Sequence, residues 1–408
     1  MRPGEKFGLA FPREEYDRRL AAIRKEMVSR GVEGLLLFAP TNLFYLTGYN
    51  TIGYTNYQCM LVTMHGDPIL VLRLLERPVG EATTWSSTIL TYEDHEDPAT
   101  AVRKAVEKAD LLSRSIAAER TSPFLSVSDY LHLEEVLGTK FADGSGIIES
   151  SRVIKSPLEL EYIRAAARCT ETGMRAAYKA IEVGKTENDV VAECYRAMVR
   201  DGSEFFSSQP ILTSGEKSGI AHTTFHRRVL KTGDAILIEI GGVWNRYTGP
   251  LMRTAGVGRV SRDVRRMYDC CVEALEATLK AIRPGARSEE VQAACQGVID
   301  RWGYEPNFRK RIGYSVGVGY APGWGEGHMM DLKHHDSREL RPGMVFHIVP
   351  ALRQYGEYGV GLSETVTVTE TGVEVISNFP RELFISGTKK KKSVANKAKS
   401  RKRKGQRG

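Results

Sequence analysis

Two glutamates in apolar, strand-like segments are the first candidates for chemistry. Glu239 interrupts the run ILIEIGG, and Glu364 lies in LSETVTV. A buried carboxylate without a partner is costly, so each must meet a protein donor or cation, or else face a ligand. An outward or edge position is the alternative for a lone glutamate in a strand, and the sequence leaves both open.

Histidines offer proton transfer near neutral pH, and His222 is the leading candidate. It lies in SGIAHTTFH, a glycine-bearing segment that precedes the strand of Glu239, and His226 competes with it. Imidazole is the usual general acid or base at this pH. A single loop histidine is more often an ordinary surface residue, so both interpretations stay open.

A second histidine group lies in the segment GHMMDLKHHD. It contains residue types that bind metals, namely His328, His334, His335 and Asp336. Their spacing matches no familiar ligand pattern. We therefore interpret this segment as a solvated loop.

The segment of residues 312–327, IGYSVGVGYAPGWGEG, is rich in glycine and aromatic residues. It lacks the Gly-Lys-Ser/Thr ending of a phosphate loop and the third glycine of a dinucleotide fingerprint. Disordered loops seldom carry residues such as Tyr314, Tyr320 and Trp324. The pattern favours a buried backbone segment that lines a pocket.

An internal repeat indicates the elements that position these residues. Residues 179–202, KAIEVGKTENDVVAECYRAMVRDG, align without gaps to residues 280–303, KAIRPGARSEEVQAACQGVIDRWG. Each copy is followed by a glycine and paired strand-like segments, which carry Glu239 in the first copy and Glu364 in the second. Two helix–helix–hairpin units should form a curved sheet covered by helices on one face, with a concave site on the other.

Length and composition predict two domains. The chain has 408 residues, 41% of them hydrophobic, which exceeds one typical core. Residues 1–150 read as an α/β domain, with a hairpin turn at Gly66 and Asp67. The capping signals Ser156, Pro157 and Glu159 open a long helix and the second domain, residues 151–387.

The net charge of +8 comes from the tail, residues 388–408. The stretch from Lys389 to Arg407 holds eleven Lys and Arg residues and no acid, which leaves 47 basic against 50 acidic residues elsewhere. The tail should be disordered and could contact polyanions weakly. The folded part is therefore not expected to bind nucleic acid.

Cysteine usage and apolar patterning predict a cytoplasmic protein. Six cysteines show no C-x-x-C pairing, and a chain of this size needs no disulfides. The N-terminal residues lack an apolar signal-peptide core, and no apolar run is long enough to span a membrane.

Several motifs resemble the creatinase and aminopeptidase P family over nearly the whole chain except the tail. They are RVIKSPLELEYIRAAA, SGIAH, GYSVGVGYAPGWGEG, and LRPGMVFHIVP followed by LSETVTVTETG. The resemblance implies a homodimer with an α/β (α+β) fold: an N-terminal creatinase-like α/β domain and a C-terminal pita-bread domain with an internal pseudo-two-fold repeat. In that family the partner's N-terminal domain helps to close the site.

The resemblance also allows the metal site of the family's peptidases to be checked by position. Those enzymes hold two metal ions with two aspartates, a histidine and two glutamates. Here Glu239 and Pro250 stand at the aspartate positions, Tyr314 at the histidine position, and Val349 and Glu364 at the glutamate positions. Proline and valine cannot bind a metal, and a neutral phenol is a poor ligand. We therefore expect no metal cofactor, as in metal-free members such as ectoine hydrolase.

The expected reaction is hydrolysis of a C–N bond in a small cationic amidine or guanidinium, or a zwitterion carrying one. Glu239 and Glu364 would hold the cation, while His222 would take a proton from water. Tyr314 would donate a hydrogen bond or cover the pocket. The predicted substrate-binding residues are Tyr320 and Trp324, which could stack on a flat cation, and Tyr54 and Gln58, which could reach the site from the neighbouring subunit.

Two alternatives remain at this stage. One is a metal-dependent Xaa-Pro peptidase with an unusual site built from Glu239, Glu364 and a further histidine. The other is a binding protein that kept the fold and lost the chemistry.

Overall fold

The computed structural model describes residues 8–387, so the basic tail lies outside the described residues and its disorder stays a prediction. The first domain holds one six-stranded sheet in the order β4-β3-β2-β1-β5-β6. Its strands are β1 (Gly34–Leu37), β2 (Cys59–Thr63), β3 (Ile69–Arg73), β4 (Thr88–Tyr92), β5 (Ile116–Ala118) and β6 (Ala142–Asp143). Its helices are α1 (Arg13–Ser29), α2 (Pro40–Thr47), α3 (Arg77–Thr83), α4 (Pro98–Lys108) and α5 (Val127–Leu137).

Local sequence explains the first domain. β1 is buried along its whole length, as its run of leucines requires when helices cover both faces of a sheet. β2 and β3 pair antiparallel around Gly66, whose φ of 74° is open to glycine and strained for most residues. The predicted hairpin is therefore confirmed.

The second domain is built on one large sheet, with a small two-stranded sheet of β14 (Ala351–Gln354) and β15 (Tyr358–Gly361) beside it. The main path of the large sheet runs β17-β16-β13-β10-β9-β8-β7. These strands are β7 (Ile211–Ser214), β8 (Ala235–Trp244), β9 (Tyr247–Gly256), β10 (Gly313–Tyr320), β13 (Val345–Ile348), β16 (Glu364–Val368) and β17 (Val373–Val375). The short strands β11 (Gly323–Gly325), β12 (Asp331–Leu332) and β18 (Phe384–Ile385) pair beside that path.

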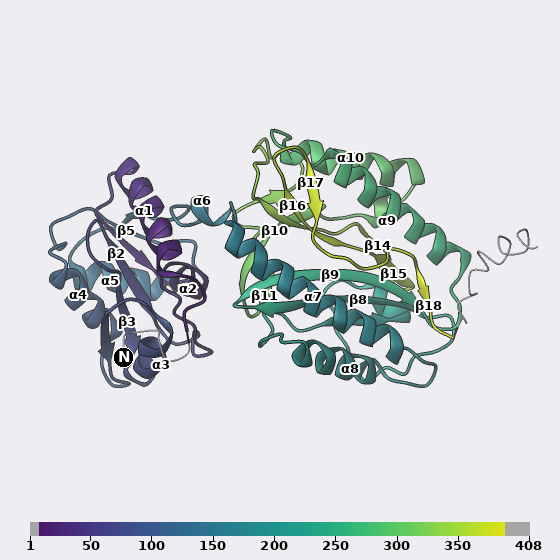
Figure 1. Cartoon of the computed structure of the whole chain (residues 1–408), viewed down its shortest axis with the longest axis horizontal. Coiled ribbons are helices and arrows are strands. Elements are labelled where there is room, and N and C mark those ends of the chain that lie inside the picture. The colour runs from purple at the N-terminus through teal and green to yellow at the C-terminus, as the bar shows by residue number, and fades with distance from the viewer. Residues whose placement is uncertain (1–7, 388–408) are drawn as a thin grey trace, which may run out of the picture.

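Two helical pairs cover this sheet, and they repeat one another (Figure 1). They are α7 (Pro157–Ala180) with α8 (Glu187–Arg200), and α9 (Arg262–Ala281) with α10 (Ser288–Trp302). The turn between the helices bridges a later segment at the same place in each copy, Thr186 to Val229 and Arg287 to Glu339. The predicted pita-bread architecture, with an α/β domain and a duplicated second domain, is confirmed.

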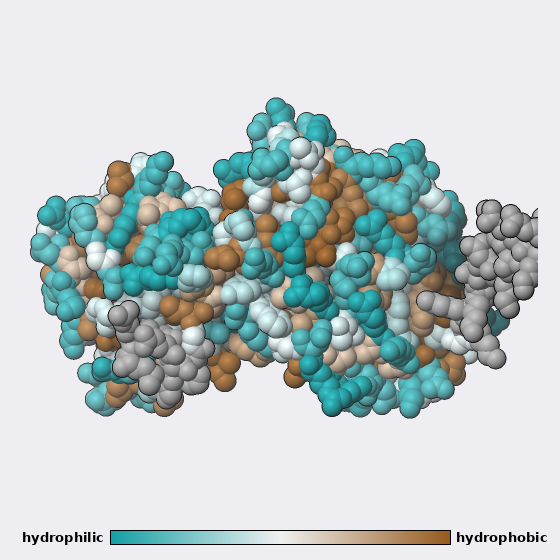
Figure 2. All heavy atoms as spheres, viewed as in Figure 1, coloured by the Kyte–Doolittle hydropathy of each residue, from teal (hydrophilic) through white to brown (hydrophobic). Residues whose placement is uncertain are grey.

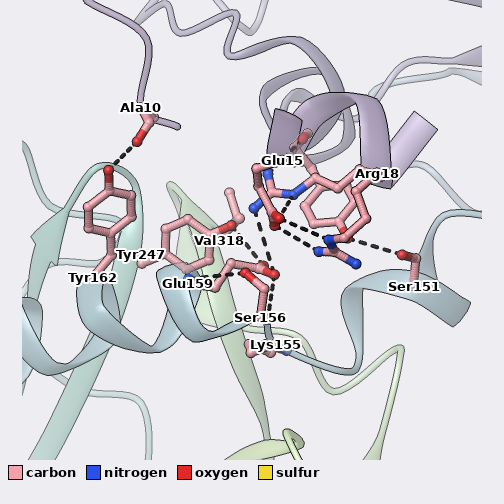
Figure 3. A network of polar contacts seen from close by, with 12 residues as sticks. Ala10, Glu15, Arg18, Ser151, Lys155, Ser156, Glu159, Tyr162, Tyr247 and Val318 are labelled. Atoms are coloured by element: carbon pink, nitrogen blue, oxygen red, sulfur yellow. Dashed lines mark hydrogen bonds and ion pairs between the residues drawn. The ribbon is translucent and has the colours of Figure 1, made fainter. Parts of the chain in front are cut away.

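A short helix, α6 (Glu149–Arg152), joins the domains, and buried ion pairs hold the junction. Arg19 of α1 is fully buried, 3.0 Å from Glu15 and 3.7 Å from Glu159 of α7. Glu159 also accepts a hydrogen bond of 2.9 Å from Tyr247 of β9 (Figure 3). It completes the capping box with Ser156, as predicted.

A second buried group ties α6 to the strand that carries the glycine-rich segment. Glu326 is 2% exposed and pairs with Arg152 through one oxygen and with Lys155, at 2.9 Å, through the other. Its Oε1 also accepts a hydrogen bond from the backbone of Val318 in β10. Glu326 is therefore satisfied by the protein and serves the junction.

The surface is mostly polar on the face shown in Figure 2, with apolar residues in small patches. Among residues 8–387, no helix is long and apolar enough to cross a membrane. All six cysteines are free and buried, in agreement with the expected reduced state.

Candidate functional site

Glu239 lies near the middle of β8, where every neighbour along the strand is buried. The residue is 8% exposed, and no hydrogen bond from the described residues reaches its carboxylate. Nδ1 of His347 lies 3.9 Å from Oε1 of Glu239. Burial raises the pKa of Glu239, while the charges of Lys310 and Arg353 oppose that shift.

Glu239 is exceptional among the buried acids of residues 8–387. Every other buried Asp or Glu side chain there accepts at least one hydrogen bond. A buried carboxylate is stable when it is bonded or paired, because burial removes its hydration. Glu239 is therefore the acid that this fold leaves available to a ligand.

Glu364 has the opposite environment. Its Oε1 accepts from Arg253 at 2.9 Å and from Arg381 at 2.8 Å, and its Oε2 accepts from Ser377. Arg253 is fully buried and Glu364 is 1% exposed. This arrangement corrects the expectation that Glu364 offers a free carboxylate to a cation, because two guanidinium groups already balance its charge.

Tyr314, at the start of β10, belongs to a chain of hydrogen bonds beside Glu239. Its hydroxyl accepts from Nε1 of Trp324 at 3.0 Å and lies 3.0 Å from Nδ1 of His347. On the other side of the imidazole, Nε2 lies 2.6 Å from Oγ of Ser363. Burial and the charge of Glu239 raise the pKa of Tyr314, so the phenol stays neutral.

Sequence reasoning missed His347. The residue is fully buried in β13, within the apolar run VFHIV, and burial holds its pKa well below the usual range. A polar side chain in an apolar strand is the same signal that singled out Glu239. Applied to every strand of the repeat, that criterion finds His347 as well.

The other positions of the family's metal site are apolar. Val349 packs in a small buried cluster with Leu237, Met252 and Ala351, and Tyr314 covers it. Gly241 of β8 pairs with Pro250 of β9. The ring of Trp324 packs so closely over Gly241 that a Cβ atom at this position would lie only 3.2 Å from it. Aromatic and aliphatic side chains thus pack at the positions of Pro250 and Val349.

These residues do not fit a metal ion. Pro250 and Val349 have no ligand atom, and the carboxylate of Glu364 is already bonded to two arginines. Within residues 8–387, no group of three His, Cys, Asp or Glu side chains is arranged to hold a metal. These positions therefore lack the ligand atoms that a metal ion needs.

Two cations, Lys310 and Arg353, act electrostatically on Glu239. Lys310 keeps exposed surface, but protein surrounds its ammonium group, and this lowers its pKa to about 8 although Glu239 acts in the opposite direction. Arg353, in β14, has a buried Nε that no protein acceptor reaches. Burial lowers the pKa of Arg353 as well, again opposed by Glu239. A negative and a positive region therefore adjoin in the site.

His222 does not join this group within one subunit. It is exposed, with a left-handed φ of 59°, and the described residues show no hydrogen bond or ion pair between it and Glu239, Tyr314 or Glu364. It follows the 3-10 turn η2 (Gly215–Gly219), which packs against β8 and β15. His226 instead contacts the guanidinium of Arg227 at 2.9 Å.

The remaining substrate-binding candidates form an aromatic group at the domain junction. Tyr320 is 5% exposed, donates to Asn50 at 3.0 Å and packs on Tyr54, with ring centres 5.2 Å apart. Its ring also lies 4.4 Å from the guanidinium of the buried Arg246. Gln58 is buried with an unpartnered Nε2. No hydrogen bond, ion pair or ring contact in the described chain joins this group to Glu239, so Trp324 alone of the four adjoins the Tyr314 chain.

The expectation that GHMMDLKHHD is a solvated loop is only partly correct, because Met329, Met330, Leu332 and Asp336 are buried. His328, His334 and His335 are exposed, and Asp336 pairs with Arg338. The predicted solvated loop includes one short strand, β12, which pairs with β10.

Comparisons with known proteins agree with this architecture. Residues 161–370 match metallopeptidase family M24, and residues 19–154 match the creatinase/prolidase N-terminal domain. An ectoine hydrolase from Halomonas elongata is 30% identical over 92% of this chain and 98% of its own length. An Xaa-Pro dipeptidase from Pyrococcus furiosus is 25% identical over 90% and 99%. The crystal structure of dipeptidase PepE from Mycobacterium ulcerans superposes with a TM-score of 0.80 at 25% identity, over 92% and 99%.

Proposed function

This chain belongs to metallopeptidase family M24, and from that premise we propose that it is a metal-independent hydrolase of a C–N bond in a small amidine or guanidinium. The favoured reaction is the ring opening of a cyclic amidine, as in an ectoine hydrolase. The single observation that carries the proposal is Glu239, a buried carboxylate that no hydrogen-bond donor among residues 8–387 reaches.

The chemistry of the substrate explains how such a site can work without a Lewis acid. The carbon of an amidinium already carries positive charge, whereas a neutral peptide carbonyl needs polarisation before water attacks it. A carboxylate 4 Å from that charge attracts it by about 4 kcal/mol at an effective dielectric near 20. Glu239 supplies this attraction, and Pro250 and Val349 leave no ligand for a competing dication.

The two cations that act on Glu239 favour a substrate that also carries a carboxylate. Lys310 and Arg353 would repel a simple cation, but they attract a carboxylate once the amidinium is held by Glu239. A guanidinium can bind a carboxylate through two parallel hydrogen bonds. The charge pattern therefore supports a zwitterion, which includes amino-acid-derived cyclic amidines and creatine-like compounds.

The reaction balances with groups already in the site. Water attacks the amidinium carbon and forms a C–O bond, and one oxygen of Glu239 takes the water proton while the other holds a substrate N–H. The raised pKa of Glu239 makes it a better base than a solvated glutamate. The leaving nitrogen takes that proton back from Glu239 as the C–N bond breaks, and the new hydroxyl group gives its own proton to the released amine, which yields an amide and an ammonium group. Tyr314 donates a hydrogen bond to the reacting group.

The relatives support this proposal unequally. The 30% identical ectoine hydrolase spans nearly both full chains, and the peptidase relatives named above reach 25%. A peptidase needs a metal site that these residues do not build, whereas a binding protein could hold the same ligand at Glu239 without turnover.

Assays of turnover with ectoine, hydroxyectoine, creatine and Xaa-Pro dipeptides, each with and without a chelator, test the proposal. We expect turnover of one zwitterionic amidine or guanidinium that the chelator leaves unchanged. Chelator-sensitive cleavage of a dipeptide, with two equivalents of bound metal, would overturn it in favour of a peptidase. Tight ligand binding without turnover would identify a binding protein.

The proposal includes a cytoplasmic homodimer. Six free, buried thiols suit a reducing compartment. His222 is exposed, and Tyr54 and Gln58 show no contact with Glu239 within the described chain, so a second copy could supply such residues to the site. Light scattering of the purified protein checks the assembly, and a monomer that turns over substrate would contradict it.

A further inference from the structure

His347 is a buried imidazole with two hydrogen-bonding neighbours and no surface. It is 0% exposed, and its neighbours are Tyr314 on the Nδ1 side, at 3.0 Å, and Ser363 on the Nε2 side, at 2.6 Å. Its ring meets that of Tyr314 nearly at a right angle, 88°. A neutral imidazole donates through one nitrogen and accepts through the other, so the two neighbours must have different roles.

The surroundings of Ser363 decide which nitrogen carries the hydrogen. Oγ of Ser363 already accepts from the backbone N–H of Met252 at 2.6 Å, and the residue is fully buried. Its single hydroxyl hydrogen needs an acceptor, and His347 Nε2 is the acceptor that the described residues offer. In the opposite arrangement this hydrogen is buried without a partner, which costs free energy. Nδ1 of His347 is therefore the protonated nitrogen, assigned from the network.

This assignment also fixes the hydrogen of Tyr314. The phenolic oxygen receives one hydrogen bond from Nε1 of Trp324 and a second from Nδ1 of His347. With both lone pairs occupied, its own hydrogen turns away from these donors. Tyr314 is the half-buried end of the chain; the charge of Glu239 acts on it, and Oε1 of Glu239 lies 3.9 Å from Nδ1 of His347.

We propose that His347 is a positioning residue: with Ser363 and Trp324 it orients the hydroxyl of Tyr314 as a hydrogen-bond donor toward Glu239 and the reacting group. That Tyr314 donates to a reacting group rests on the proposed function. The orientation itself rests on the packing of Ser363, His347, Trp324 and Tyr314.

The neutral state of each member supports this role. Burial keeps the imidazole of His347 uncharged, and burial together with Glu239 keeps the phenol of Tyr314 protonated. Hydrogen bonds in a chain polarise one another, so a phenol that accepts two donors is itself a stronger donor.

The first test reads the hydrogen position without any substrate. Full-length protein labelled with 15N-histidine contains nine histidines, and the signal that disappears in His347→Gln belongs to His347. We expect the Nδ1–H tautomer in the wild type and a mixture of tautomers in Ser363→Ala. An Nε2–H tautomer in the wild type would overturn the proposal.

The second test is a double-mutant cycle on kcat/KM and on ligand binding by calorimetry. Replacing Tyr314 by Phe, or His347 by Gln, should lower kcat about three- to tenfold with a smaller change in KM. Because His347 acts through Tyr314, the double variant should match Tyr314→Phe. Additive losses would show that His347 acts on its own and would overturn the proposal. His95→Gln, at an exposed histidine, is the matched control.

The two tests separate failure of this inference from failure of the proposed function. If no amidine or guanidinium is bound or turned over, the proposed function fails, and the tautomer measurement still decides the orientation. If His347→Gln does not fold, Ser363→Ala replaces it in the cycle, since it breaks the same link and leaves the imidazole in place. Wild-type kcat in Ser363→Ala, with the tautomers mixed, counts against the proposal.

Discussion

Glu239 and Glu364 are buried acids on neighbouring hairpins of one sheet, yet they have opposite environments. Two arginines and a serine satisfy Glu364, whereas Glu239 accepts no hydrogen bond from residues 8–387 and has only His347 within 4 Å as a basic neighbour. Burial alone therefore does not identify a functional acid in this fold. The presence or absence of a protein partner separates an acid that holds the structure from one that is free to meet a substrate.

The internal repeat makes this contrast sharper. Aligning the two copies places Val349 opposite Glu239 and Arg253 opposite Glu364. Arg253 reaches across the pseudo-two-fold axis to its own counterpart, at 2.9 Å, while Val349 gives Glu239 no polar contact. The pair Arg253 and Glu364 forms a salt bridge, whereas the pair Val349 and Glu239 leaves the carboxylate of Glu239 without a polar partner.

The largest expected effect is on catalysis at Glu239. Glu239→Gln keeps the shape and removes the charge and the base, so we expect kcat/KM to fall about 10³-fold. Glu370→Gln, at an exposed acid after β16, is the control and should leave kcat/KM unchanged. A variant at Glu239 that keeps wild-type kcat/KM, measured with a substrate found in the turnover screen, would remove the basis of the proposed site.

The next effect is on stability at Glu364. Glu364→Gln leaves Arg253 and Arg381 without their counter-charge in a buried position, so we expect unfolding free energy to fall by about 3–5 kcal/mol in urea denaturation. The matched control is Glu374→Gln, which breaks an exposed pair with Arg164 and should cost less than about 1 kcal/mol. Equal losses in the two variants would contradict the contrast.

A smaller effect is expected on the selectivity for a zwitterion. Lys310→Met should raise KM about tenfold for a substrate with a carboxylate and leave an amidine without one unaffected or better bound. Because the pKa of Lys310 is about 8, the wild-type KM should rise as pH increases through that value, and the variant should lose this dependence. Identical responses of the two substrates would exclude Lys310 from carboxylate binding.

The smallest effect is on the pH dependence of stability. The folded pKa of Glu239 is raised above its ordinary value of 4.5, so its stabilising contribution is complete below that value and declines as pH rises through the folded pKa. Glu239→Gln should therefore gain stability relative to the wild type between pH 4.5 and 7 in urea denaturation. A difference that stays constant or shrinks over this range would indicate an unshifted carboxyl group.

Most of the fold could be predicted from the sequence because its signals are local. The capping box at Ser156, the turn at Gly66 and the repeat of residues 179–202 in residues 280–303 depend on neighbours within a few positions. The structure places each of these features as expected. The apolar replacements Pro250 and Val349 were also readable, since they depend only on residue type.

The partners of the acids could not be read in the same way. Arg381 and Ser377 both reach Glu364 from the segment that follows β17. No periodic pattern in the sequence predicts either contact. The link of His347 to Tyr314 joins positions that are 33 residues apart. Such contacts depend on how the strands of the second repeat pack against each other. The alternation of apolar and polar residues along one strand does not encode that packing.

The buried ion pairs of Arg152 and Lys155 with Glu326 affect how a substrate can reach the site at Glu239. Swinging the first domain away about α6 would pull the buried Arg152 away either from Thr41 and Asn42 of the first domain or from Glu326, at about 3–5 kcal/mol. At tenfold per 1.4 kcal/mol, fewer than about one molecule in a hundred would stand open in this way. We therefore expect a substrate to reach the site through local rearrangements rather than through a wide opening between the two domains.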